Sequence, residues 1–320
     1  MQSSTQTNRL EHFPVMFFTV SMGFGGLSLA YLKAHEELAI PIEFFYLFRA
    51  ITSVVFVVAF LFYAMKFFKY RAQVVWEFSH PIRLHFFPAF SIALLLLSAL
   101  YSRFSLLSMT LFWFGLIIHT FLTFHTVRFW INNSFEIARS NPAWFIPIVG
   151  NLIIPALAHD IHPVLLSYFF ALGVFFWLVL FSIIFYRIIF HPQLAQKFMP
   201  TLFIFIAPPA IALLGYLNLN GIRFDLLAQM FLNLALFFAF LLIFMYKNFI
   251  KLKFFISWWA FTFPLAALSI ALIRAFSISN LAPYFHLALL FLIATTIIIG
   301  IVSFKTYRSI LRQEVCVAEE

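Results

Sequence analysis

Residues 254–273 read FFISWWAFTFPLAALSIALI, twenty positions without a single Asp, Glu, Lys or Arg. A helix of roughly twenty residues spans the hydrocarbon core of a bilayer, which is about 30 Å thick. Because backbone that crosses lipid must satisfy its own hydrogen bonds, this segment is predicted to be a transmembrane helix. Pro264 lies inside the segment and removes one backbone donor from that helix.

Nine other stretches of the chain share this absence of charge. The ten stretches are residues 13–32, 50–65, 84–102, 104–127, 140–159, 161–186, 198–222, 226–246, 254–273 and 275–304. The second is short for a span, but it extends backwards through Phe44, with Arg49 reaching outward to the interface. Strands of a β-barrel would be about half as long and would alternate in polarity. The sequence therefore predicts an all-α membrane protein of ten transmembrane helices.

The composition excludes most other classes of protein. Hydrophobic residues make up 64% of the chain and charged residues 10%, against about 25% charged in a soluble domain. The single cysteine, Cys316, allows neither an intramolecular disulfide nor a cysteine-based metal site. No phosphate-binding or dinucleotide-binding glycine motif occurs. These features predict a protein that is not an enzyme and has no cofactor, and whose +9 charge serves membrane orientation rather than nucleic-acid binding.

The basic residues divide unequally between the two sets of connections. One side would hold fifteen of them, namely Arg9, Lys66, Lys69, Arg71, Arg83, Arg128, Arg139, Arg187, Lys197, Lys247, Lys251, Lys253, Lys305, Arg308 and Arg312. The other side would hold Lys33, Arg49, Arg103, Arg223 and Arg274. The positive-inside rule then predicts cytoplasmic tails at residues 1–12 and 309–320, flanking a transmembrane domain at 13–308.

Four prolines reveal an internal repeat. Pro88, Pro147, Pro208 and Pro264 lie in alternate segments at spacings of 59, 61 and 56 residues. A further step back from Pro88 lands near Gly25 in the first segment. A repeat of two helices preserves direction across the membrane. The pattern predicts five helical hairpins around a central pore, with inner helices kinked at Gly25 and at the four prolines, and with the carbonyls freed by the kinks lining that pore.

Several motifs resemble one known family, the tellurite-resistance/dicarboxylate transporters, which include the plant slow-type guard-cell anion channels. The motifs are EFSHPIRLHFFP at residues 77–88, Gly150-Asn151, Ala207-Pro208-Pro209 and SWWAFTFP at residues 257–264. The resemblance covers about residues 13–308. One departure is Ser21, where bacterial members often carry a proline, so the first inner helix would bend through its glycines instead.

The resemblance implies a homotrimer in the bacterial inner membrane, with a separate pore in each subunit. It also implies that Phe263 closes the pore and that chloride, nitrate, malate, sulfite or related anions pass. A residue before proline is pushed away from regular helix, so the Phe263 ring could project toward the axis. We expect small hydroxyls such as Thr19, Ser21, Ser91 and Ser269 to meet the anion, and Arg274 and Arg83 to attract it at the two mouths.

Two alternatives to an anion channel stay open. The first is a proton-coupled carrier of dicarboxylate or sulfite, although no acidic residue lies at mid-segment, where such carriers commonly bury one. The second is a membrane oxidoreductase with haem between histidines, such as His119 or His125 with His85 or His286. A separate cluster, His159-Asp160-Ile161-His162, has ligand-like residues but lacks further partners nearby, so no metal site is predicted.

Overall fold

The computed structural model describes residues 9–157 and 161–317, and this part of the chain is helical with no strand. Five hairpins follow one another, each with an inner segment that starts as a 3-10 helix and continues as an α-helix. The inner segments are η1 Val15–Phe17 with α1 Phe18–Leu38, η2 Arg83–Phe86 with α4 Pro88–Leu100, η4 Pro142–Phe145 with α6 Ile146–Leu157, η5 Gln196–Ile206 with α8 Ala207–Leu219, and η6 Ile256–Phe261 with α11 Thr262–Ser279.

Each inner segment is followed by one long outer helix. The outer helices are α2 Glu43–Lys69, α5 Ser105–Asn132, α7 Pro163–Phe190, α9 Leu226–Phe244 and α12 Ala282–Leu311. Short elements between hairpins are α3 Arg71–Phe78, η3 Ile137–Arg139 and α10 Lys247–Ile250. In the described part of the chain, nine helical segments are long and apolar enough to cross a membrane, and the tenth, Pro142–Leu157, is shorter.

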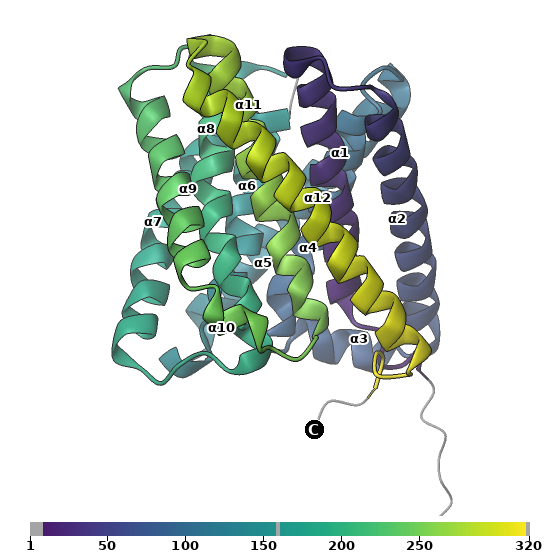
Figure 1. Cartoon of the computed structure of the whole chain (residues 1–320). Helices are drawn as coiled ribbons and strands as arrows, with labels where there is room; N and C mark the ends of the chain where they lie inside the picture. The colour runs from purple at the N-terminus through teal and green to yellow at the C-terminus, as the bar shows by residue number, and fades with distance from the viewer. Residues whose placement is uncertain (1–8, 158–160, 318–320) are drawn as a thin grey trace, which may run out of the picture.

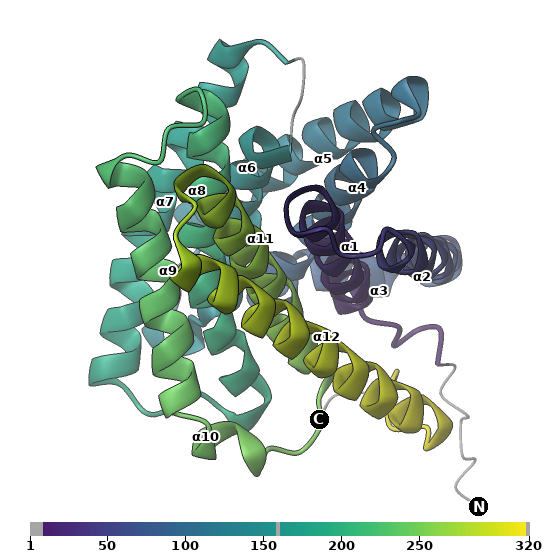
Figure 2. The ribbon, with the colours of Figure 1, turned by 45° about the horizontal axis from the view of Figure 1, so that its top comes forward.

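The inner helices form a closed ring. α1 packs against α4, α4 against α6, α6 against α8, α8 against α11, and α11 returns to α1. Each outer helix packs on the inner helix of its own hairpin, as Figures 1 and 2 show. In the four longer inner spans 72–78% of the most apolar stretch is buried, against 22–44% in the outer helices. The remaining outer surface is apolar, as a lipid-facing surface must be.

The four prolines mark the point where each inner segment changes helix type. Pro88 is the first residue of α4, Pro147 and Pro208 are the second residues of α6 and α8, and Pro264 is the third of α11. The first turn of an α-helix is where a missing N–H costs least. The prolines therefore begin the α-helical part rather than kink its middle.

Gly25 does not play the predicted part in the first hairpin. α1 runs without a break from Phe18 to Leu38, and its change from 3-10 to α lies at Phe17 and Phe18, before any glycine. A Cβ on Gly25 would meet its nearest neighbours, on Leu96 and Thr52, at an ordinary 3.4 Å. The expected bend at Gly25 is thus replaced by the same 3-10 to α change that the other four inner segments show.

A short side-chain hydrogen bond accompanies each of these changes. One polar side chain per inner segment donates to the carbonyl three residues earlier: Thr19 to Met16 at 2.7 Å, Ser91 to Pro88 at 2.9 Å, Asn151 to Ile148 at 3.0 Å, Thr201 to Phe198 at 2.6 Å and Thr262 to Trp259 at 2.7 Å. Hydroxyls on the outer helices bond four residues back instead, as in Thr295 to Phe291, and so does Ser269 further along α11. Asn151 also donates to the i−4 carbonyl of Pro147. The side chains thus follow the tighter i−3 spacing of the 3-10 turn.

Candidate functional site: a closed axial pore

A small cavity of about 50 Å³ lies on the axis of the ring, and all five inner segments contribute to its wall. Most lining side chains are apolar, including Met22, Ile92 and Ile153. The hydroxyls in the wall belong to Thr19, Thr201 and Ser257, and the first two are engaged with their own helix. The cavity therefore offers an anion few side-chain donors and no charged partner.

Phe263 lines this cavity and is half-buried. Its ring lies directly against the backbone of α1, because Gly26 has no side chain there. A Cβ built on Gly26 would come within 3.0 Å of Phe263 Cδ2 and of the Ala266 Cβ. The glycine thus lets the aromatic ring and α1 approach one another beside the axis.

A larger cavity of about 670 Å³ opens at the end of the ring where the inner segments begin. It shares Met16, Phe86, Ile256 and Ser257 with the axial cavity, so the two cavities adjoin one another. We call it the mouth cavity. Its polar wall includes His12, His80, Arg83 and Lys197, and the segment Glu314–Val317 also lies in it. Burial raises the pKa of the Cys316 thiol to about 11.

Arg83, predicted to attract anions, does line the mouth cavity, but it is held by a buried acid. Its Nη1 lies 2.7 Å from Glu77 Oε1, and Lys66 Nζ lies 2.9 Å from Glu77 Oε2. Glu77 and Lys66 are each about 1% exposed. Tyr63 also donates to Glu77, at 2.9 Å. One carboxylate is thus shared by two cations, which leaves this cluster with a net charge of +1 beside the mouth.

The Glu77 cluster also connects neighbouring elements of the bundle. Lys66, in the last turn of α2, donates to the carbonyl of Phe13 at 2.9 Å, immediately before the first inner segment. Arg83 is the first residue of η2 and lies over the ring of Trp76, 4.8 Å from its centre. Sequence analysis did not find the cluster, because its members lie on α2, α3 and η2 and meet only in the folded chain.

Arg274, predicted for the opposite mouth, is also paired. Its Nη1 lies 3.1 Å from Glu37 Oε1, and Ser277 donates to the other carboxylate oxygen at 2.6 Å. Both partners are partly exposed, at 18% and 24%. The pair joins the last turn of α1 to α11, where the first and fifth hairpins meet. The sequence contains a signal for this ion pair, because Glu37 and Arg274 both follow the apolar part of an inner segment.

Of the hydroxyls expected to line the pore, two face outer helices instead. Ser91 is within 2.9 Å of His119 Nδ1 on α5, and Ser269 is within 3.4 Å of Thr295 on α12. Ser21 is fully buried and its hydroxyl has no hydrogen-bond partner in the described structure. Only Thr19 lies in the cavity wall. The hydroxyls of Ser91 and Ser269, which were predicted to face the axis, instead contact residues of the outer helices.

The carbonyls of two of the prolines themselves show the same arrangement. The carbonyl of Pro147 accepts hydrogen bonds from Thr123 of α5 at 3.0 Å and from Asn151 at 3.1 Å. Asn151 in turn donates to Thr123 at 3.1 Å. The Pro88 carbonyl accepts from Ser91, whose hydroxyl also meets α5. These two carbonyls are satisfied on the side of the outer helix.

The histidines considered for haem are packed separately. His85 accepts a hydrogen bond from Trp130 at 2.9 Å and stacks on Trp144, with 4.9 Å between ring centres. His125 stacks on Phe78 at 4.1 Å. The ring of His119 fills the space where a Gly150 side chain would stand. These three rings pack against different protein groups, and one nitrogen of each has no hydrogen-bond partner in the described structure: His85 Nδ1, His119 Nε2 and His125 Nε2.

The ligand-like group near residue 160 is only partly described. His159 and Asp160 lie outside the described residues, while His162 caps α7 by accepting a hydrogen bond from the Val164 amide at 3.3 Å. Within residues 9–157 and 161–317, no three His, Cys, Asp or Glu side chains gather as a metal site would require.

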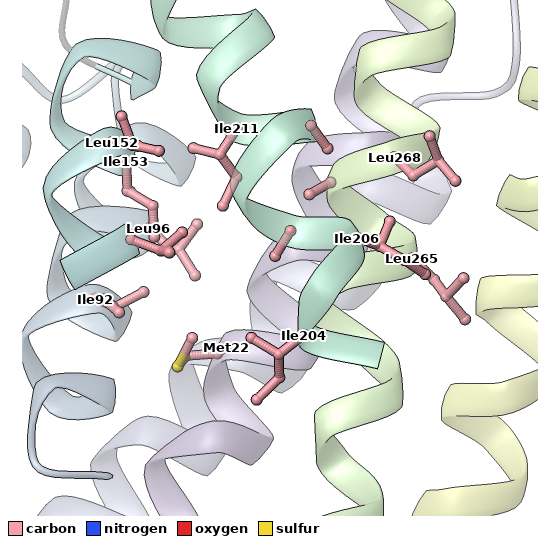
Figure 3. Close-up of a cluster of buried hydrophobic side chains, with 14 of the residues drawn as sticks. Met22, Ile92, Leu96, Leu152, Ile153, Ile204, Ile206, Ile211, Leu265 and Leu268 are labelled. Carbon is pink, nitrogen blue, oxygen red and sulfur yellow. The ribbon is translucent and has the colours of Figure 1, made fainter. Parts of the chain in front are cut away.

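Beyond the axial cavity, the centre of the ring is filled by aliphatic side chains from all five inner segments (Figure 3). Leu96, Ile153 and Ile211 point into the space between α4, α6 and α8 in this view. They are 1%, 2% and 2% exposed. The axis is therefore closed in this structure both beside Phe263 and further along.

This architecture defines a helical membrane protein whose five parallel inner segments surround a closed, largely apolar axial path. Residues 12–307 match the voltage-dependent anion channel (SLAC1) family. Because the match spans nearly the whole chain, the protein belongs to that family. The family resemblance expected from the sequence motifs is thereby confirmed, and so is the prediction of a multi-pass helical membrane protein.

Similar proteins come from plants, bacteria and archaea. The S-type anion channel SLAH2 of Arabidopsis thaliana is 32% identical over 225 residues, covering 68% of this chain and 42% of the plant protein. An uncharacterized transporter of Methanocaldococcus jannaschii is 27% identical over 282 residues, covering 80% and 82%. The tellurite resistance protein TehA homolog of Haemophilus influenzae is 24% identical over 264 residues, covering 80% and 79%. The chain thus spans less than half of the plant channel's length.

Proposed function

We propose that this protein is an anion channel, or a channel-like anion exporter, in which Phe263 closes the path. The observation that carries the proposal is the axial cavity, which all five inner segments line and which has Phe263 in its wall. An aromatic ring obstructs ions by its size and by excluding water. The half-buried Phe263 ring, backed by Gly26, stands where such an obstruction would act.

Selectivity for anions would come from diffuse positive potential rather than from a charged binding site. The five inner helices run in parallel, so their positive N-terminal ends all lie toward the mouth cavity. The Glu77 cluster places two cations, Lys66 and Arg83, and one carboxylate at the same end. An anion that enters the apolar cavity would then find no group that binds it tightly, which suits conduction.

The membrane orientation and the oligomeric state belong to the same proposal. The excess of Lys and Arg in the connections at the mouth-cavity end supports placing that end, and both tails, in the cytoplasm of a bacterial inner membrane. The family resemblance further suggests a homotrimer with one path per subunit, whose substrates would be chloride, nitrate and related small or carboxylate anions. Light scattering of the detergent-purified protein measures the subunit number.

The deciding experiment measures reversal potentials in chloride, nitrate, sulfate and malate, on wild type and Phe263→Ala together. We expect a larger anion current from Phe263→Ala at equal surface expression, with a reversal potential that follows the anion gradient. A Phe263→Ala current no larger than that of wild type would remove the gate from the proposal. A flux in liposomes that requires a pH gradient would instead favour a proton-coupled carrier of dicarboxylate or sulfite.

A further inference from the structure

The axial cavity ends at a second set of large side chains, of which Ile153 still lines the cavity. Side chains four residues apart lie on the same face of an α-helix, about 6 Å further along its axis. The cavity-lining residues Ile92, Val149 and Ala207 are followed four positions later by Leu96, Ile153 and Ile211. The same face of α4, α6 and α8 therefore presents a branched aliphatic residue where the cavity ends: Ile153 at its edge, and Leu96 and Ile211 outside its lining.

The other two inner helices contribute little bulk at this level. Four residues beyond the cavity-lining Met22 is Gly26, and four beyond Phe263 is Ala267. The Phe263 ring, which packs against Gly26, borders this level. Ala267 is 3% exposed. Closure of the axis at this level consequently depends on Leu96, Ile153 and Ile211, which Figure 3 shows pointing into one space. We name these three residues the aliphatic collar.

We propose that the aliphatic collar is a second barrier to permeation, in series with Phe263 and independent of it. This inference rests on the proposed function, since it assumes that anions follow the axis. A narrow passage with apolar walls gates by excluding water, and an ion that loses its hydration there gains nothing in return. The collar offers neither donors nor charge to replace that hydration.

Two barriers in series leave a distinct pattern in the current. If the two resistances are comparable, removing either one raises the current at most about twofold. Removing both raises the current more than fourfold, which is more than the product of the two single effects. If Phe263 were the only barrier, a collar substitution would change nothing once the aromatic ring is gone. The decisive comparison is therefore a collar variant in the Phe263→Ala background.

The chain offers matched controls next to two collar residues. Leu95 is as deeply buried as Leu96, but it faces Gly115 of α5, where a Cβ would lie 3.0 Å from Leu95 Cγ. Leu152 precedes Ile153 and packs against Gly173 of α7. Truncating Leu95 or Leu152 therefore loosens the same helices without opening the axis.

The experiment records chloride current, normalised to surface expression, for wild type, Phe263→Ala, Ile153→Ala and the double variant. Leu152→Ala in the Phe263→Ala background serves as the control. We expect the double variant to exceed Phe263→Ala alone by more than tenfold, and the control to match Phe263→Ala. A double-variant current equal to that of Phe263→Ala overturns the collar and leaves the gate standing. A double-variant current equal to that of Ile153→Ala, with both above wild type, overturns the gate and leaves the collar. Four equal currents overturn both.

A second substitution avoids the loss of packing that alanine brings. Leu96→Asn keeps the branched shape and the number of non-hydrogen atoms and places an amide on the axis, whereas Leu95→Asn places it toward α5. In the Phe263→Ala background we expect only Leu96→Asn to raise the current, because only that amide can hydrate the passage. Equal effects of the two asparagines would show that destabilised packing, and not wetting of the collar, changes the current.

Discussion

Gly150→Ala tests the closest helix contact in the bundle. The added methyl group would overlap the ring of His119 on α5 and would lie 3.0 Å from Ile92 Cδ1 on α4. His119 cannot simply turn aside, because its Nδ1 is hydrogen-bonded to Ser91 at 2.9 Å and the whole residue is buried. Overpacking of this kind costs about 1–3 kcal/mol, and occasionally more. We place Gly150→Ala at the upper end, near 3 kcal/mol.

A double-mutant cycle with His119→Ala tests whether overlap with the His119 ring causes the loss of stability in Gly150→Ala. His119→Ala alone loses packing and a hydrogen bond, but in the Gly150→Ala background it also removes the overlap. We therefore expect the double variant to be more stable than the sum of the single losses predicts, by about 1–3 kcal/mol, as for residues in direct contact. The free energy of unfolding is measured by titrating the detergent-solubilised protein with SDS and following tryptophan fluorescence.

The matched control is Gly25→Ala, the same substitution in the middle of another inner helix. Its Cβ would meet all neighbours at 3.4 Å, so we expect no loss and a gain of up to about 1 kcal/mol from the better helix former. Strictly additive losses in the cycle, or an equal loss from Gly25→Ala, would refute the packing of His119 on Gly150.

Three further predictions concern the ion pairs and the thiol. Glu77→Gln leaves Lys66 and Arg83 buried without their carboxylate, and we expect a loss of about 3–5 kcal/mol in the same SDS titration; a loss below 1 kcal/mol would contradict the shared pair. Arg274→Gln exposes the carboxylate of its partner at the far mouth, so anion current entering from that side should fall, and fall less at high salt because the charges are screened. Because burial raises the pKa of the Cys316 thiol to about 11, against about 8.5 for a free cysteine, its alkylation should be slower in the folded protein than in SDS. The folded-state rate should keep rising as the pH approaches 11, and equal rates in both states would show an accessible thiol.

The sequence predicted the number and order of the hairpins because charge-free length and proline spacing are local properties. The extension of the second span back to Phe44 is confirmed by α2, which begins at Glu43. The proline positions indicated where each inner segment changes conformation, but not that the change is from a 3-10 helix to an α-helix. A proline at a 3-10 to α boundary and a proline that kinks an α-helix can occupy the same position in the sequence. Packing within the ring decides which of the two structures forms.

The site was harder to predict because its polar contacts join distant segments. Arg274 and Glu37 are 237 residues apart, and their pairing follows from closure of the ring between α1 and α11. Ser91 and Ser269 could face the axis or an outer helix at the same depth, since a helix turns through all directions within four residues. The hydrophobic pattern does not decide this, because both sides of an inner helix are apolar.

The 3-10 starts of the inner segments make the entrance of the path longer than α-helices of the same residues would make it. A residue in a 3-10 helix rises about 2.0 Å and turns about 120°, while one in an α-helix rises about 1.5 Å and turns about 100°. Moving a boundary by three residues would therefore shorten a segment by about 1.5 Å and rotate all that precedes it by about 60°. In four of the segments this shift would carry a proline past the first turn of its α-helix, where it has no N–H to donate and clashes with the preceding turn. Because the lipid bilayer penalises such a break in the backbone, the four prolines fix the length of the entrance.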